Sequence, residues 1–193
     1  MMTYNIIRVD MKNLACCFIG HREIIETNEL KTNLIQIIED LIVNKKVAIF
    51  LFGSKSQFND LCLSVVTELK EKYSYIKRIK YTCKSESCIL ESEKDEWQKI
   101  FSNLYKQDVE VLAVEEEFEH KTKYTVGKAS YVERNQAMID DSDYCIFYYD
   151  EDYQPKARKY SKNSIGYYQP KSGTKLSYDY AKRKKKFIIN CFK

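Results

Sequence analysis

Three short segments of this 193-residue chain combine glycine with hydroxyl or cationic side chains, and a fourth joins an arginine to an asparagine, as phosphate-binding sites do. Three of them stand where an apolar run ends or an amphipathic pattern begins, and the fourth lies early in an amphipathic pattern. Such segments can offer backbone N–H groups and positive charge to an anion. The candidate ligand-binding residues are Gly20, His21, Arg22, Gly53, Ser54, Arg134, Asn135, Ser172, Gly173 and Thr174.

The segment Ser172 to Thr174 directly precedes a helical pattern that starts at Thr174. The first turn of a helix leaves backbone N–H groups unpaired, and the helix dipole adds positive charge there, which together suit a phosphate. Gly173 would let the ligand approach the backbone closely. The alternative is an ordinary helix cap by a hydroxyl side chain, with no ligand. Gly53 and Ser54 repeat the arrangement, but neither a Walker A loop nor a GxGxxG fingerprint is present.

His21 and Arg22 follow a buried apolar run without a break. A guanidinium can pair with a phosphate or a carboxylate through two hydrogen bonds, and a histidine can stack on a base or bind a sugar. The alternative is a structural pair between Arg22 and Glu23 or Glu26. Arg134 and Asn135 lie early in another amphipathic pattern, where an arginine could again hold a phosphate.

Three acidic residues, Asp140, Asp141 and Asp143, follow that pattern. Such a cluster could bind a metal or supply a general base, but more often it caps and solvates a turn. Cys83 and Cys88 have the spacing C-x4-C without further ligands nearby, so we predict no metal site. The seven cysteines are an odd number, which favours free thiols over a disulfide framework.

Apolar runs that alternate with helical patterns must position these residues, and they predict a parallel sheet covered by helices on both faces. The carboxyl ends of the strands then form the ligand edge. The expected strands are Leu14–Ile19, Val47–Phe52, Ile76–Cys83, Tyr144–Tyr149 and Lys186–Phe192, with Val109–Val114 as a strand or a looser piece. The expected helices are Glu29–Asn44, Phe58–Lys72, Glu91–Lys106, Val132–Asp140 and Thr174–Lys184. Residues 151–171 are expected to form a loop-rich insertion at the ligand edge, in one domain of residues 1–193. The tyrosines of this insertion could stack on a base or pack the loop, and they are Tyr153, Tyr160, Tyr167 and Tyr168.

Composition sets wider limits on the class of protein. Hydrophobic residues make up 44% of the chain, with 5 glycines and 2 prolines, which excludes collagen-like and low-complexity proteins. No apolar run is long enough for a membrane span or resembles a secretory signal, so a cytoplasmic protein is expected. The net charge is +4, but residues 156–193 hold 12 Lys and Arg against one Asp, which gives +11 there. That stretch indicates either an anionic partner such as a nucleic acid or a solvated helix end.

Three segments resemble the signatures of the YpsA-like proteins. The segment CCFIGHRE resembles their cysteine-rich first strand with its GHR element. YVERNQAMIDDSDYCIFYYD resembles their Arg-Asn signature, and SGTKLSYDYAKRKKKFIIN resembles their Gly-Thr helix start and final strand. YpsA-like proteins belong to the SLOG superfamily, with the DNA-processing protein A domain and the "lonely guy" phosphoribohydrolases. The resemblance implies a Rossmann-like three-layer sandwich, with a mostly parallel sheet and helices on both faces.

The resemblance also implies a nucleotide or ADP-ribose-like ligand, held by the ten residues named above, and relatives of this kind often form homodimers. The phosphoribohydrolases carry PGGxGTxxE, whose glutamate helps to cleave the base–ribose bond. In this chain Ser177 stands at the place of that glutamate, and Glu133 or Asp150 would have to replace it. Three functions follow: a nucleotide-binding sensor, a nucleotide N-glycosidase, or a module for single-stranded nucleic acid in which tyrosines lie between cations.

Overall fold

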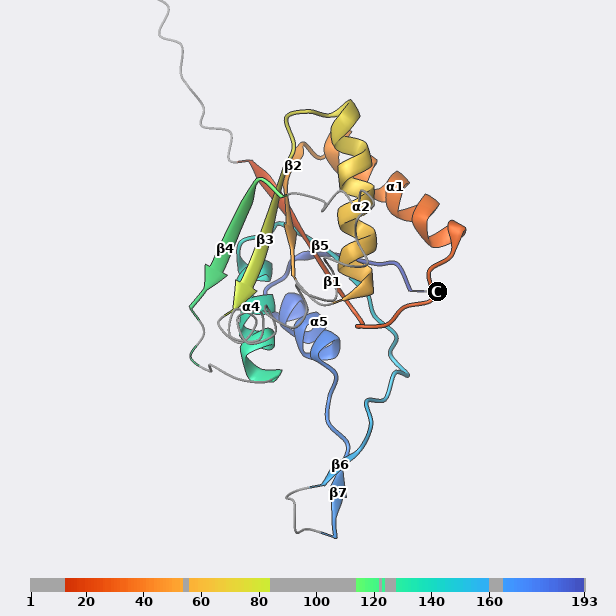
Figure 1. The fold of residues 1–193 in the computed structure, drawn as a ribbon, viewed down its shortest axis with the longest axis vertical. Coiled ribbons are helices and arrows are strands. Elements are labelled where there is room, and N and C mark those ends of the chain that lie inside the picture. The colour runs from red at the N-terminus through yellow and green to blue at the C-terminus, as the bar shows by residue number, and fades with distance from the viewer. Residues whose placement is uncertain are drawn as a thin grey trace, which may run out of the picture.

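The computed structural model describes residues 13–53, 56–83, 114–121, 123, 128–159 and 165–192. Among these residues, six strands form one parallel sheet in the order β4-β3-β2-β1-β5-β8 (Figure 1). These strands are β1 (Leu14–Gly20), β2 (Val47–Phe52), β3 (Lys77–Cys83), β4 (Glu116–His120), β5 (Tyr144–Tyr148) and β8 (Phe187–Asn190). The described helices are α1 (Asn28–Val43), α2 (Gln57–Lys72), α4 (Lys128–Asp140) and α5 (Gly173–Arg183). The α/β fold is therefore Rossmann-like, as the sequence predicts.

The two faces of the sheet carry separate apolar clusters, because successive side chains of a strand point to opposite faces. In β1, Cys16 and Phe18 pack into the cluster that α1 and α2 cover. Cys17 and Ile19 instead join the cluster under α4 and α5. The six described cysteines are all buried. Four of them lie in apolar runs, where a thiol acts as a small hydrophobic group: Cys16, Cys17, Cys145 and Cys191. This double coverage explains the continuous apolar runs of the central strands.

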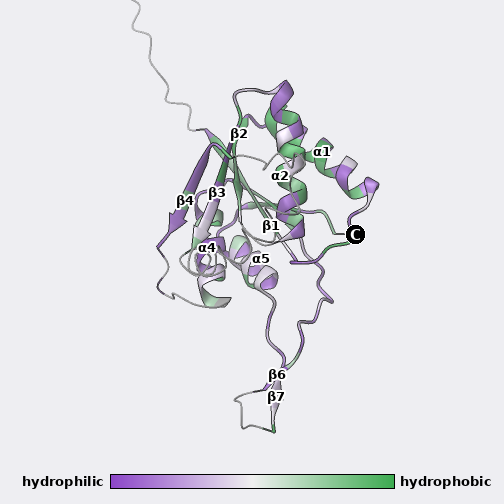
Figure 2. Cartoon of the chain, in the orientation of Figure 1, coloured by the Kyte–Doolittle hydropathy of each residue, from purple (hydrophilic) through white to green (hydrophobic). Residues whose placement is uncertain are grey.

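Two segments differ from the sequence expectations. The edge strand β4 has the sequence EEFEH and is mostly hydrophilic (Figure 2), so no apolar pattern marked it. The expected helix Glu91–Lys106 and most of the expected strand Val109–Val114 lie outside the described residues, and Val114 itself is not in a strand. Within the expected insertion, β6 (Arg158–Lys159) and β7 (Tyr167–Tyr168) form a short antiparallel ladder that projects from the sheet (Figure 1).

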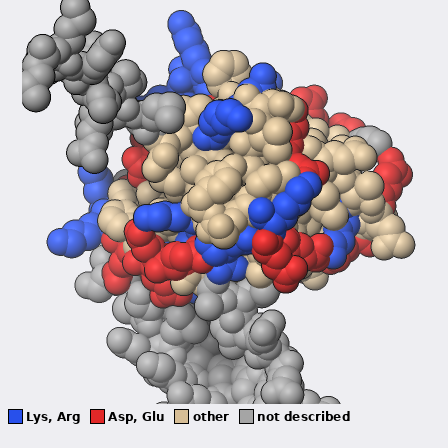
Figure 3. All heavy atoms as spheres, turned by 90° about the horizontal axis from the view of Figure 1, so that it is seen from above, with Lys and Arg blue, Asp and Glu red and all other residues tan. Residues whose placement is uncertain are grey.

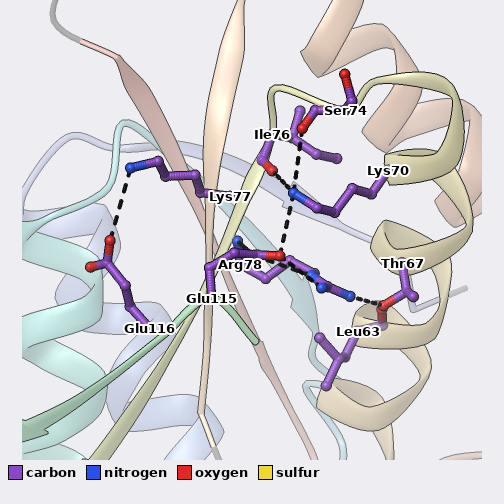
Figure 4. A network of polar contacts seen from close by, with 9 residues as sticks. All are labelled: Leu63, Thr67, Lys70, Ser74, Ile76, Lys77, Arg78, Glu115 and Glu116. Atoms are coloured by element: carbon purple, nitrogen blue, oxygen red, sulfur yellow. Dashed lines mark hydrogen bonds and ion pairs between the residues drawn. The ribbon is translucent and has the colours of Figure 1, made fainter. Parts of the chain in front are cut away.

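An ion-pair network fixes the residue that precedes β4 to β3 (Figure 4). Both carboxylate oxygens of Glu115 accept from the Arg78 guanidinium, at 2.8 and 3.3 Å, and Oε2 also accepts from the Arg78 backbone N–H. Arg78 in turn donates to Thr67 on α2, and Lys70 forms a second ion pair with Glu115 at 3.3 Å. Burial alone would raise the pKa of Glu115, but the hydrogen bonds and charge of Arg78 and a hydrogen bond from Lys70 lower it to about 2. The network thus joins α2, β3 and the start of β4.

Candidate functional site

A cavity of about 570 Å³ lies at the carboxyl end of β1. The strand order reverses here, because β2 and β3 lie on one side of β1 whereas β5 and β8 lie on the other. Ligands of Rossmann-like folds bind at this position. Eight of the ten predicted residues line the cavity: Gly20, His21, Arg22, Arg134, Asn135, Ser172, Gly173 and Thr174. Gly53 lies against one of them, because a Cβ added there would be 2.9 Å from Arg134 Nη2. Ser54 lies outside the described residues.

The turn that begins α5 has the geometry of a capped helix start beside an open space. Ser172 Oγ accepts a hydrogen bond from the Lys175 N–H at 2.9 Å, which is the cap that the sequence left as an alternative. The backbone N–H groups of Gly173 and Thr174 have no acceptor among the described residues. A Cβ added at Gly173 would meet nothing within 4 Å, so the backbone there is open to the cavity. The cap and an anion site are therefore compatible.

A chain of hydrogen bonds runs from this turn to Arg134 on α4, whose guanidinium lies close to Gly53 after β2. Asn135 Oδ1 accepts from Arg134 Nη2 at 2.9 Å, and Asn135 Nδ2 donates to Ser177 Oγ at 3.2 Å. Ser177 Oγ donates to the Gly173 carbonyl at 3.0 Å, so this residue supports the turn from beneath and is completely buried. Arg134 is only 4% exposed, and its guanidinium lies in the cavity lining next to Gly53.

His21 is held in one orientation by its neighbours. Its Nε2 accepts from the Asp150 backbone N–H at 3.1 Å, and its carbonyl accepts from Ser56 Oγ at 2.9 Å. Burial lowers the pKa of His21, and the nearby Asp150 carboxylate only partly opposes this shift. A neutral imidazole that accepts at Nε2 carries its proton on Nδ1. The Tyr153 ring lies 4.2 Å from the imidazole, centroid to centroid, and extends the aromatic wall toward solvent.

Arg22 and Gly20 have different roles beside this histidine. The Arg22 side chain is exposed at the cavity, and no carboxylate of the described residues pairs with it, so the predicted alternative of a bridge to Glu23 or Glu26 is wrong. Gly20 has a packing reason to be glycine, because a Cβ there would lie 2.6 Å from three atoms of Phe58. Arg22 is thus a cation available to a ligand, whereas Gly20 permits close contact between β1 and α2.

Other cavity residues were not predicted as part of the site. The sequence analysis did not identify Ile19, Ser56, Asn59, Tyr131, Val132, Pro155, Arg158 and Pro170, which also line the cavity, whereas it named Tyr153 as a residue that could stack on a base at the ligand edge. Asn59 is 6% exposed, and its Oδ1 accepts from the Gly53 N–H at 2.9 Å. A serine and an asparagine in the first turn of a helix that follows a strand would have been a signal for Ser56 and Asn59. The sequence placed the 151–171 segment at the ligand edge, and the tertiary structure shows which of its residues line the cavity, namely Tyr153, Pro155, Arg158 and Pro170.

The acidic cluster after α4 is structural. Asp143 Oδ2 accepts from the Ala15 N–H at 3.0 Å, and Asp141 accepts from the Tyr81 hydroxyl at 2.8 Å. Asp140 pairs with Lys184 at 2.8 Å. No group of three or more metal-ligating side chains occurs within the described part of the chain. The cluster therefore ties β1, β3 and the end of α5 to this turn.

The cations of the C-terminal stretch are partly engaged within the fold. Lys186 donates to the carbonyl groups of Asp140 and Ser142, and Lys175 lies 3.8 Å from Asp179. Seen from above the view of Figure 1, basic and acidic side chains are interspersed on the same face (Figure 3).

No helix of the described residues is long and apolar enough to cross a membrane.

Comparison with known proteins bears on this geometry. A family model named YpsA and described as the YspA SLOG family matches residues 21–182, which include nine of the ten predicted ligand residues. No curated protein matches the chain.

Proposed function

Because the chain belongs to the YpsA family of SLOG proteins, we propose that it binds a nucleotide or a nucleotide derivative in the cavity at the end of β1. The observation that carries the proposal is the charge of the cavity. Its lining includes three arginines, Arg22, Arg134 and Arg158, whereas none of its described lining residues is Asp or Glu. A concave site with this charge selects an anionic ligand.

The two ends of the cavity suit different parts of a nucleotide. At one end, the open Gly173 and Thr174 N–H groups and the dipole of α5 favour a phosphate. At the other, the Tyr153 ring lies 4.2 Å from the His21 ring, centroid to centroid and tilted by 39°, and offers an aromatic surface to a base. Because the Tyr153 side chain is 48% exposed, it can turn toward a ligand without breaking a packed core.

The lining favours binding over cleavage of the base–ribose bond. Ser177, at the place of the glutamate in phosphoribohydrolases, is buried beneath the turn and holds Asn135 and Gly173. Neither Glu133 nor Asp150 lines the cavity, and Glu133 accepts from the Lys123 N–H instead. An oxocarbenium-like transition state needs a carboxylate close to the sugar. A nucleotide sensor therefore fits the cavity better than a glycosidase does.

Thermal shift measurements with AMP, ADP, ATP, NAD and ADP-ribose test the proposal. A ligand at 100 times its Kd stabilises the fold by about 2.7 kcal/mol, or about 5 to 10 °C in Tm for a chain of this length. Arg22→Ala should leave the Tm of the free protein unchanged and reduce the ligand shift. The matched control is Arg183→Ala in the last turn of α5, outside the cavity lining. Absence of a shift with every nucleotide would refute the proposal, and release of free base would favour the enzyme.

Nucleic-acid binding remains a second candidate because of the segment that carries β6 and β7. Its Tyr167 side chain is 59% exposed and lies 5.7 Å from Lys159 Nζ, and its Arg158 is also exposed. Exposed tyrosines between cations suit stacking on single strands. Binding to a labelled single-stranded oligonucleotide should then weaken steeply as salt rises. An affinity that does not depend on salt would exclude this role.

A further inference from the structure

One buried side chain of the cavity has donors that the fold does not use. Asn59 lies in the first turn of α2, and its Oδ1 is fixed as the acceptor because the Gly53 backbone N–H donates to it at 2.9 Å. The opposite atom, Nδ2, therefore carries two N–H donors, and none of the described residues accepts from them. A donor in so buried a side chain is stabilised by a hydrogen-bond acceptor, so the two N–H groups of Asn59 Nδ2 are available to a ligand.

An acceptor for these donors must approach through the cavity. Every completely buried side-chain N or O atom in the described part of the chain has a hydrogen-bond partner. Asn59 Nδ2 donates to none of the described residues, so it must retain contact with solvent. Asn59 lines the cavity, and only 6% of the residue is exposed in total. Since α2 begins at Gln57, its dipole places positive charge at the same point.

The Asn59 amide lies at one end of a series of polar groups at the cavity. From Gly173 this series runs through Ser177 and Asn135 to Arg134 by hydrogen bonds of 3.0, 3.2 and 2.9 Å. Arg134 Nη2 lies beside Gly53, where an added Cβ would be 2.9 Å away, and Gly53 binds Asn59. One guanidinium thus stands between the first turn of α5 and the first turn of α2.

We infer that Asn59 forms a second anion subsite, so that the cavity prefers ligands with two linked phosphates over ligands with one. This inference rests on the proposed function and names the ligand class for the same site. One phosphate binds the Gly173 and Thr174 N–H groups, and the other accepts from Asn59 Nδ2. Arg134 stabilises both, because a guanidinium presents several donors in one plane.

Calorimetric titrations with AMP, ADP, inorganic phosphate and pyrophosphate test the inference. The wild type should bind ADP and pyrophosphate at least tenfold more tightly than AMP and phosphate. Asn59→Asp keeps the oxygen that accepts from Gly53 but replaces the amide donors by a carboxylate oxygen. It should weaken ADP binding at least tenfold, change AMP binding less than about threefold, and so remove the preference. Asn28→Asp makes the same change in the first turn of α1, away from the cavity, and should alter neither affinity.

The outcomes separate the two proposals. Equal wild-type affinities for AMP and ADP, or equal losses of both in Asn59→Asp, would overturn the second subsite and leave nucleotide binding intact. If the wild type binds none of the four compounds and no other nucleotide, the proposed function fails and the subsite with it. Because the wild-type comparison needs no substitution, the test holds even if Asn59→Asp does not fold.

Discussion

Replacement of Glu115 by glutamine should destabilise the protein in a way that depends on pH. Glu115 accepts three hydrogen bonds from Arg78, and its pKa falls from an ordinary 4.5 to about 2. Glutamine retains the shape of the side chain but removes the charge. The Arg78 side chain, only 10% exposed, then loses its partner carboxylate, which weakens the attachment of β4 to β3.

The size of the effect follows from the pKa. The difference between 4.5 and about 2 corresponds to at most about 3.4 kcal/mol, at about 1.36 kcal/mol for each pKa unit. The Glu115 side chain is 30% exposed, and solvent screens the pair, so about 1 to 2 kcal/mol is expected at pH 7. Because the folded pKa is the lower one, this stabilisation is complete above about pH 5 and is lost as the pH falls toward 2.

Urea unfolding at pH 7, 4.5 and 3.5 measures this directly. The free energy of unfolding of Glu115→Gln should lie below that of the wild type at pH 7, and the difference should shrink at pH 3.5. Glu117→Gln is the matched control, since Glu117 pairs with Lys80 at 3.1 Å but its side chain is 61% exposed. A loss in Glu115→Gln equal to that in the control, or a difference from wild type that stays constant with pH, would refute this reasoning.

Three further predictions concern the site. Gly20→Ala should lower the free energy of unfolding by about 1 to 3 kcal/mol through overpacking against α2, whereas Gly173→Ala should leave it nearly unchanged and weaken nucleotide binding, as urea unfolding and calorimetry would show. The variant His120→Gln retains only one imidazole, and its NMR titration should give His21 a pKa below 6.5. Because the folded pKa is the lower one, the contribution of His21 to the free energy of unfolding should fall as the pH drops through 6.5. A pKa above 6.5 would contradict the burial argument. Ser177→Glu should lower the Tm, because Ser177 is completely buried and a carboxylate there replaces the hydroxyl that bonds Asn135 and Gly173, and it should yield no free base from nucleotides.

The positions of most helices and central strands could be predicted because local sequence controls them. The run from Leu14 to Ile19 is apolar at every position, so it can only lie between two covered faces, and the structure places it at the centre of the sheet. The hydrophilic strand β4 could not be predicted, because an edge strand buries too little to leave an apolar pattern. The strand pairs with β3 through backbone hydrogen bonds, which residue types do not reveal.

The sequence by itself determined which segments end at the ligand edge, since parallel strands all point their carboxyl ends to one side. His21 and Gly173 were predictable for that reason, whereas Arg134, which lies within α4, was predicted through the family resemblance; the three do line one cavity. Only the tertiary structure decided that Asn59 turns its amide to Gly53 and that Tyr153 lies on His21. These contacts join residues far apart in the chain, and their geometry depends on how helices pack on the sheet, which no local pattern encodes.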